Sequence, residues 1–474
     1  MQTTFHGYTI ADFPDKVKHK ENYRTKASLY TRGPLCIAMV SPQQKIKNLG
    51  ADNRGKVCYT IESSILFIIH SKEAFPLKSW RGYLTAAILA AMTWAVSQLA
   101  ARFSTLVDMI YPYVIRTFQT MLAEWTSSVD FCLWQLAAVV LGVLLLASIV
   151  LMIVLKWNPI QWFGWILTVC AALYLGHTLV FGLNYYAGDL ADDIRLEVVE
   201  YNVDELTEAA EYYRDKANAL ASQVSRDGNG NVDFADFDTL AAQAAEGFQT
   251  LTYDYSYSIF AGSTLPVKKL GWADMYTSMG ITGVTMGLTG EAAVNPQTPD
   301  VCLPFTMCHE MAHRMCIASE KDANFAGFLA CMANSSVEFQ YSAYFMAYRY
   351  CYNALASDGS AEASAAAARV VKGVSDQLYQ DLTYFSQFFS SKQNKTAAKV
   401  ANTANDTYLK TSGEASGVKS YGEVCDLLVS WHIQQIVLPE ITETEKPFDP
   451  LDENQVDLSG IVNAKPTEGT EPNG

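Results

Sequence analysis

Three long uncharged stretches stand out from the mixed pattern of hydrophobic and polar positions along the chain. They cover residues 82–101, 131–155 and 159–183, which are 20, 25 and 25 residues long. A helix needs about 20 mainly apolar residues to cross a bilayer, so each stretch is long enough. Tryptophans lie mostly near the ends of these stretches, as they do at membrane interfaces. The pattern therefore predicts three transmembrane helices, the last two joined by a tight turn at residues 156–158.

Hydrophobic periodicity after the third stretch predicts a mainly helical body. The exception is residues 262–300, which are rich in Gly, Thr, Val and Pro and predict short strands. A further amphipathic helix is expected at residues 105–125, lying along the membrane surface. We therefore expect a mainly α fold, with three N-terminal transmembrane helices followed by a helical domain that contains a small strand region. The helical segments of that domain are expected at residues 186–223, 241–250, 304–352, 360–389 and 420–437.

The charge changes sign along the chain. The net charge of −15 divides into +7 for residues 1–81, zero for 82–185 and −22 for the remainder. Because basic segments stay in the cytoplasm, we predict a multi-pass protein of the cell membrane with a cytoplasmic N-terminus and an extracytoplasmic body. The acidic body argues against nucleic-acid binding, which needs a basic surface. The expected parts are a basic arm (1–81), a membrane domain (82–185), the body (186–439) and an acidic disordered tail (440–474).

The segment CHEMAHRM carries the candidate chemistry, because it contains an HExxH motif formed by His309, Glu310 and His313. With 7 His in 474 residues, chance would produce this motif about 0.004 times. Residues four apart share one face of a helix, so both imidazoles can point at one metal ion. Glu310 is then beside the ion, where it can take a proton from water.

A third metal ligand is expected from the run EKDANF that follows the motif. Glu320 and Asp322 are both candidates, separated from His313 by six and eight residues. The segment Glu320–Asn324 resembles the ExxA[ND] pattern of gluzincin metallopeptidases. That resemblance implies that Glu320 is the third ligand of a Zn²⁺ ion and that Asn324 orients a ligating histidine. The spacing departs from most gluzincins, in which the second helix follows later.

Longer stretches resemble an uncharacterised family of bacterial multi-pass membrane proteins with an HExxH core. The resemblance is carried by FGLNYY, by the segment from LPVKKLGW to SEKDANFAGFLA, by VEFQYSAYFMAYRY and by YLKTSGEASGVKSYGEVCDLL. It covers roughly residues 82–437. The family usually has Gly three residues after the second motif histidine, where this chain has Cys316. The resemblance implies zinc peptidase chemistry without indicating a substrate.

The predicted function is that of a membrane-anchored zinc metallopeptidase acting on a peptide or protein, with Glu310 as general base. Tyr341 and Tyr344 are candidate oxyanion donors, and His432 is a weaker one, although a structural role is favoured for all three, as core aromatics in the case of the tyrosines. The alternatives are a non-catalytic membrane sensor or assembly factor with a structural zinc, and a different zinc hydrolase. The strand expected at residues 289–295 either binds an extended substrate by β-addition or is a plain strand that supports the motif helix.

Two further motifs could serve either a structural or a functional role. Residues 225–236 resemble a calcium-binding EF-hand loop, but position 1 is Ser and position 12 is Asp, so a polar turn between helices fits better. His177 lies within the third apolar stretch and is expected to pack against a neighbouring helix. No C-x-x-C pair occurs among the ten cysteines, and buried free thiols are expected.

Overall fold

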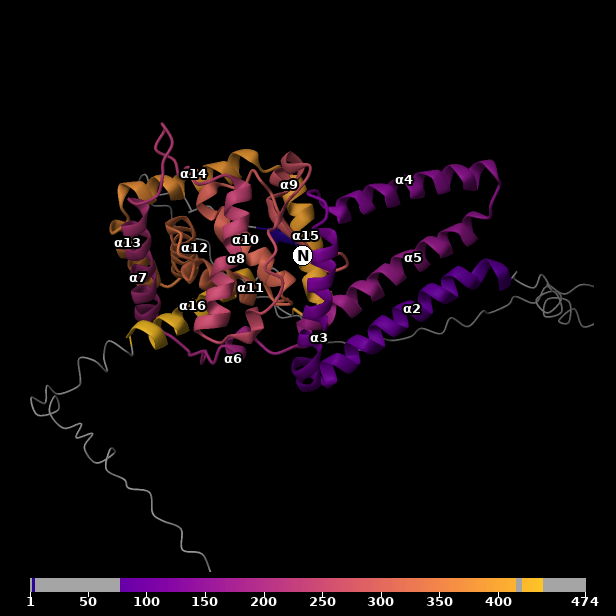
Figure 1. Cartoon of the computed structure of the whole chain (residues 1–474), viewed down its shortest axis with the longest axis horizontal. Coiled ribbons are helices and arrows are strands. Elements are labelled where there is room, and N and C mark those ends of the chain that lie inside the picture. The colour runs from indigo at the N-terminus through magenta and orange to yellow at the C-terminus, as the bar shows by residue number, and fades with distance from the viewer. Residues whose placement is uncertain (1, 5–76, 415–419, 438–474) are drawn as a thin grey trace, which may run out of the picture.

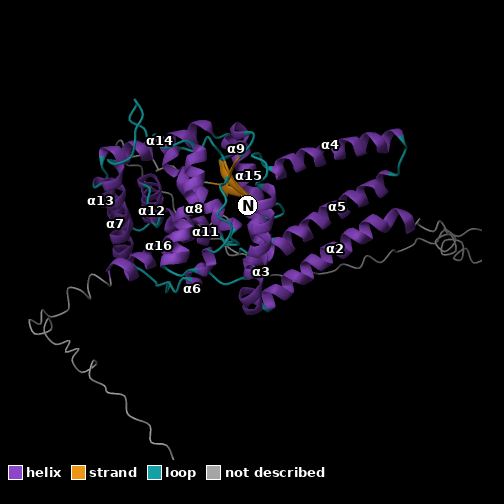
Figure 2. Ribbon diagram, viewed as in Figure 1, coloured by secondary structure: helices purple, strands orange, loops and turns teal. Residues whose placement is uncertain are grey.

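The computed structural model describes residues 2–4, 77–414 and 420–437, arranged as a helical body from which a bundle of long helices projects (Figure 1). Most of the basic arm and the whole of the acidic tail predicted from the sequence lie outside the described residues. Figure 2 shows that helices dominate both parts and that the strands form one small cluster. The mainly α fold with a small strand region is therefore confirmed.

The three projecting helices match the predicted membrane spans. They are α2 (Leu77–Arg102), α4 (Leu133–Val154) and α5 (Pro159–Val180), and each is long and apolar enough to cross a bilayer. Gly82 of α2 lies against the backbone of Gly164 in α5, and the hydroxyl of Thr168 donates to the carbonyl of Gly82 at 2.8 Å. Small residues at this contact let the two backbones approach closely, as is common between membrane helices.

Helix α3 (Ser104–Thr126) lies between the first two membrane helices in the sequence and packs on the body. Its buried Gln119 donates from Nε2 to the carbonyls of Val180 and Gly287, both at 2.8 Å. Its buried Arg116 donates to the carbonyls of Met315 and Ser258, at 3.2 and 3.1 Å. The predicted amphipathic helix is thus confirmed, and its polar residues bind backbone groups of the body.

Helices α10 and α11 form the centre of the body, and every residue of α10 is buried. Glycine lets two pairs of helices pack closely. Gly327 of α11 faces His309 of α10, and Gly247 of α8 faces the carbonyl of Ala330 in α11. The body helices are α6 (Leu190–Asp193), α7 (Val203–Ala221), α8 (Phe237–Asp254), α9 (Ala273–Met279), α10 (Leu303–Arg314), α11 (Glu320–Met332), α12 (Val337–Ser357), α13 (Ala361–Lys372), α14 (Asp376–Lys392), α15 (Lys395–Ser412) and α16 (Ser420–His432).

The sheet lies beside α10 and has the strand order β1-β3-β4-β2. Strands β3 (Ile281–Met286) and β4 (Glu291–Val294) form an antiparallel pair, and β2 (Lys268–Lys269) runs parallel to β4. β1 (Gln2–Thr4) pairs antiparallel with β3 at the other edge. Because β4 lies between β2 and β3, the prediction that residues 289–295 bind a substrate strand is wrong. Strand β3 is likewise flanked on both sides, by β1 and by β4.

The cysteines and the 225–236 loop have structural roles where they are described. Eight cysteines are free thiols, and all of these except Cys170 are buried. In the loop, the carboxylate of Asp227 accepts the backbone N–H groups of Asn229 and Asn231, and Asp236 caps α8. These carboxylates therefore bind backbone groups, as expected for a polar turn between helices.

Candidate metal centre

The HExxH residues lie in the middle of the fully buried helix α10. Pro304 in its first turn suits a helix start, since proline has no N–H to leave unbonded there. His309 and His313 are one helical turn apart, with ring centroids 4.5 Å from each other, and neither side chain is exposed to solvent. The helix thus brings both imidazoles to one face, as the four-residue spacing predicts.

Glu320 completes the group from the first residue of α11. Its Oε2 lies 3.4 Å from Nε2 of His309 and 3.6 Å from Nε2 of His313. The three ligand atoms all lie within 4.8 Å of one another. Both Nε2 atoms and both Glu320 oxygens are buried without a hydrogen-bond partner among the described residues. Burying such groups without partners is costly, so the arrangement fits a metal ion at their centre.

The electrostatics of the group also suit a cation. Burial alone would raise the pKa of Glu320, but the imidazoles of His309 and His313 outweigh burial and lower this pKa to about 2. Nδ1 of His313 lies 2.8 Å from the carbonyl of Ile317. If Nδ1 carries the proton for this bond, Nε2 presents its lone pair toward Glu320. The carboxylate is therefore anionic near neutral pH and faces two nitrogen donors.

The turn between the two helices explains why six residues suffice between His313 and Glu320. Cys316 adopts a left-handed conformation with φ of 74°. Backbone N–H groups of Cys316 and Ile317 bond to the carbonyls of His313 and Ala312, which closes α10. The chain then reverses within three residues and α11 begins at Glu320. A side chain at Cys316 is thus compatible with the turn, although it occupies a conformation that favours glycine.

Asp322, the other candidate third ligand, lies apart from the imidazoles. It lines a separate cavity, and burial, helped by the nearby Asp189, raises its pKa to about 7. Of the two acidic residues, the structure brings only Glu320 into the group with His309 and His313.

Glu310 points from α10 toward strand β3. The hydroxyl of Thr285 donates to Oε2 of Glu310 at 2.6 Å. Gly283, two residues earlier on the same side of the strand, faces the same carboxylate, and a Cβ there would collide with it. In β1, Thr3 pairs with Gly283, so an extended backbone runs antiparallel to β3 next to Glu310. The carboxylate of Glu310 is therefore held beside strand β3.

Asn324, which was predicted to orient a ligating histidine, binds a tyrosine instead. Asn324 is on α11, one turn after Glu320, and its Oδ1 accepts the hydroxyl of Tyr350 at 3.1 Å rather than a histidine N–H. Tyr350 is partly buried, and loss of solvent raises its pKa, with a further contribution from Glu320. Asn324 thus joins α11 to α12, and its Nδ2 has no partner among the described residues.

The two tyrosines predicted to stabilise an oxyanion make other contacts. The hydroxyl of Tyr341 donates to Asp381, whose carboxylate also binds the guanidinium of Arg226. Tyr344 packs edge-on against Tyr212 and Phe328. Their observed contacts are those of the aromatic core. His432 is part of the same core, where its ring lies 4.8 Å from that of Tyr212.

Several residues near the centre could not be identified from local sequence patterns. Tyr408 of α15 is hydrogen-bonded to Nε2 of His177 at 2.8 Å, and Glu320 contributes to raising its pKa to about 12, after burial. Phe181, just beyond the end of α5, clusters with Ala318 and Leu409. The residue that follows α5 is thus packed against the turn between α10 and α11, the two helices that carry the candidate metal ligands.

A family model described as a protein of unknown function (DUF3810) matches residues 107–429. The chain belongs to this family. The match extends from α3 to α16, so this DUF3810 protein shares with its family the region containing α4, α5 and the whole candidate metal centre. Neither a curated protein nor a solved structure matches this DUF3810 chain.

Proposed function

We propose that the protein is a membrane-anchored, zinc-dependent metallopeptidase. The observation that carries this proposal is the buried group of His309, His313 and Glu320, with the carboxylate of Glu310 beside it and outside the ligand set. A site that serves only to brace helices needs ligands but does not need an additional carboxylate. The arrangement therefore favours hydrolysis over a purely structural role.

The donor set supports zinc as the metal. Two imidazole nitrogens and one carboxylate oxygen form the three-ligand set of catalytic zinc sites, which keep a fourth position for water or substrate. When bound, a zinc ion supplies Lewis acidity that makes water more acidic and polarises a substrate carbonyl. His309 and His313 would hold the ion from α10, and Glu320 from α11.

Glu310 is proposed to take the proton of the attacking water and pass it to the leaving amine. The bond from Thr285 holds the carboxylate of Glu310 in a defined position, which suits proton transfer. The outer edge of β3 is proposed to bind the substrate as an extended strand, because β1 demonstrates that a backbone fits there in antiparallel register. A peptide on this edge would pass beside Glu310.

A second candidate function is a membrane sensor or assembly factor with a structural metal. One observation favours it: His309, His313 and Glu320 have no exposed surface, whereas a catalytic site needs a path for substrate. We favour the peptidase because structural zinc sites usually have four protein ligands, and only three are gathered among the described residues.

The deciding experiment compares the wild-type protein with Glu310→Gln in proteoliposomes. Metal content is measured by mass spectrometry, and cleavage is measured with a mixture of random peptides. We expect about one zinc per chain in both proteins, and a loss of cleavage of about 10²–10⁴-fold in the variant, as for removal of a general base. Glu200→Gln, at an exposed position, is the matched control. Equal cleavage by Glu310→Gln, or absence of metal from the wild type, would contradict the proposal.

A further inference from the structure

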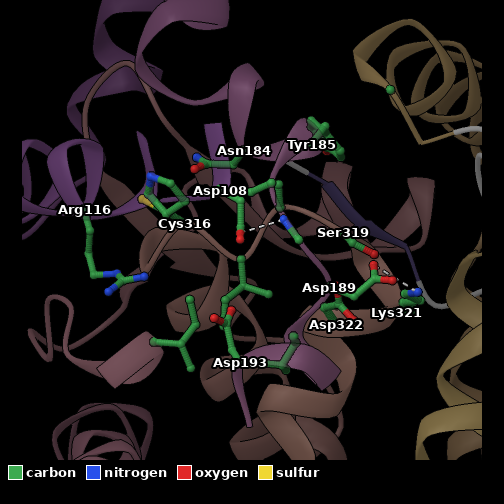
Figure 3. Close-up of a pocket in the computed structure, with 18 of the residues that line it drawn as sticks. Asp108, Arg116, Asn184, Tyr185, Asp189, Asp193, Cys316, Ser319, Lys321 and Asp322 are labelled. Carbon is green, nitrogen blue, oxygen red and sulfur yellow. Dashed lines mark hydrogen bonds and ion pairs between the residues drawn. The ribbon is translucent and has the colours of Figure 1, made fainter. Parts of the chain in front are cut away.

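A polar cavity of about 270 Å³ lies where the membrane-proximal helices meet the body (Figure 3). Its walls come from α3, from the segment that follows α5, from the turn joining α10 to α11 and from the residues after α15. It is slightly smaller than the ~300 Å³ at which pockets for drug-sized ligands begin, so it suits a small molecule. None of the proposed metal ligands lines it, which makes it distinct from the candidate metal centre.

Three buried side chains in the wall have polar atoms that the described protein leaves without partners. Arg116, Asn184 and Asp322 are 5%, 5% and 4% exposed. Nη2 of Arg116, Oδ1 of Asn184 and Oδ1 of Asp322 have no hydrogen-bond partner among the described residues. Leaving such a group unsatisfied costs about 1–3 kcal/mol each. A ligand for this cavity therefore needs donors for two oxygens and an acceptor for one guanidinium N–H.

The cavity is lined by more acidic than basic side chains, which favours a ligand with a cationic group. Five carboxylates face two basic side chains: Asp108, Asp189, Asp193, Asp322 and Glu414 against Arg116 and Lys321. Lys321 is already paired with Asp189 at 3.2 Å, and Asp108 accepts the N–H of Gly188 at 2.8 Å. Loss of solvent and the neighbouring Asp108 raise the pKa of Asp193 to about 6, which reflects this crowding of negative charge.

A bare divalent cation does not fit these carboxylates. Among the described residues, three ligand atoms come within 4.8 Å of one another only at His309, His313 and Glu320. A ligand of several atoms can reach both groups, whereas one ion cannot. Figure 3 shows Arg116 and Asn184 on one side of the cavity and Asp322 on the other. The unsatisfied donor and the unsatisfied carboxylate oxygen therefore face different parts of the same ligand.

We propose that this cavity binds a small zwitterion with a primary ammonium group and an oxyanion. The ammonium group donates to Asp322 on one side of the cavity, and the oxyanion accepts from Arg116 on the other. Two sources share this chemistry: the phosphoethanolamine headgroup of a membrane lipid, and a free aminoalkyl phosphate or amino acid. The lipid source is favoured by position, because Asn184 and Gly188 follow the end of α5 at Val180 by only a few residues.

The test uses the full chain, purified in detergent and freed of lipid. Binding of O-phosphoethanolamine is measured by calorimetry, with O-phosphocholine as the comparison compound, since its quaternary ammonium has no N–H to donate. The lipid source is examined by the unfolding temperature in nanodiscs of phosphatidylethanolamine or phosphatidylcholine. The variants are Asp322→Asn and, at the rim, Asp193→Asn. The matched control is Asp192→Asn, an exposed neighbour on α6 that does not line the cavity.

We expect the primary amine to bind at least tenfold more tightly than phosphocholine, and each cavity variant to weaken binding about tenfold or more, as for a charge-assisted hydrogen bond. Asp192→Asn should bind like the wild type. Binding of the soluble compound alone identifies a free ligand, and stabilisation by the ethanolamine lipid identifies a headgroup. The proposal is wrong if the protein binds O-phosphoethanolamine no more tightly than O-phosphocholine and is stabilised no more by phosphatidylethanolamine than by phosphatidylcholine. It is also wrong if Asp193→Asn and Asp322→Asn both bind like the wild type.

Discussion

The position of Glu310 depends on two small features of strand β3. Gly283 leaves room for the carboxylate, and Thr285 donates a hydrogen bond to it at 2.6 Å. A general base works best when one proton-accepting geometry is fixed before substrate arrives. Neither residue resembles a catalytic motif, yet both set the position of the Glu310 carboxylate.

Replacing Thr285 by Val should lower the rate of peptide hydrolysis about tenfold, because the charge-assisted bond to Glu310 is lost while the side-chain volume is kept. Metal content should not change, since Thr285 does not contact the three ligands in any described bond. The measurement is kcat at saturating peptide, and Thr285→Ser serves as the control that retains the hydroxyl. A normal rate in Thr285→Val would mean that this bond does not position the base.

His432 should make the protein sensitive to mild acid. Burial lowers the pKa of His432 from 6.5 to about 4. The unfolded chain therefore binds this proton first, so stability is lost as the pH falls from 6.5 toward 4. In His432→Phe, which keeps an aromatic ring against Tyr212, the loss between pH 7 and pH 5 should be smaller by about 1 kcal/mol, allowing for partial solvent screening. Denaturant unfolding at the two pH values measures this difference, and parallel losses would contradict it.

At the scale of elements, α4 is joined to the sheet at its first turn. The buried Glu291 of β4 accepts the N–H groups of Leu133 and Trp134 at 2.8 and 2.9 Å, and also binds Lys268 at 2.8 Å. A carboxylate at this position satisfies orphan donors and complements the positive end of the helix dipole. The membrane helix and the strand next to β3 are thereby fixed to one another.

Glu291→Gln should destabilise the protein by about 2–4 kcal/mol, because Lys268 would lose its only carboxylate partner among the described residues in a buried setting. Unfolding by denaturant in detergent micelles measures the change, and Glu200→Gln at an exposed position controls for the loss of one charge. Equal stability of the two variants would show that the cap is dispensable.

The sequence predicted those elements whose signal is local. Long apolar runs located α2, α4 and α5, and the HExxH spacing placed His309 and His313 on one face, since both are properties of a single helix. The prediction missed α9 within the strand region and did not anticipate α15, where alanine and polar residues leave little apolar contrast. Thr285 and Tyr408 could not be assigned, because their proximity to the centre comes from packing between segments far apart in the chain.

At the scale of the whole molecule, the two ends of the N-terminal arm give opposite indications of the side of the membrane on which the arm lies. If α2, α4 and α5 cross the bilayer, the N-terminal end of α2 lies on the side away from the body (Figure 1). The pairing of β1 with β3 places residues 2–4 on the side of the body. The basic charge of residues 1–81 favours the cytoplasm for the whole arm. With a cytoplasmic arm, the edge of β3 is available to a substrate strand.

We expect the arm to be cytoplasmic and the body extracytoplasmic. Epitope tags at the N-terminus and after Gly228, which has open space around it, report the two sides in intact cells. External protease should remove the tag at Gly228 and leave the N-terminal tag intact. Removal of both would contradict the charge-based topology and would agree with β1 remaining on the sheet.

The hydrogen bond from Arg116 to the body matters for the design of truncated fragments of this protein. Its guanidinium holds the carbonyl of Met315, at the end of the helix that carries His309 and His313, from a position 199 residues earlier in the chain. A recombinant fragment that starts at residue 186 lacks this anchor, and the family match likewise begins within α3. Fragments cut at the apparent start of the body should therefore be poor reporters of metal binding. In a genetic screen, lesions in α3 would be scored among catalytic mutants.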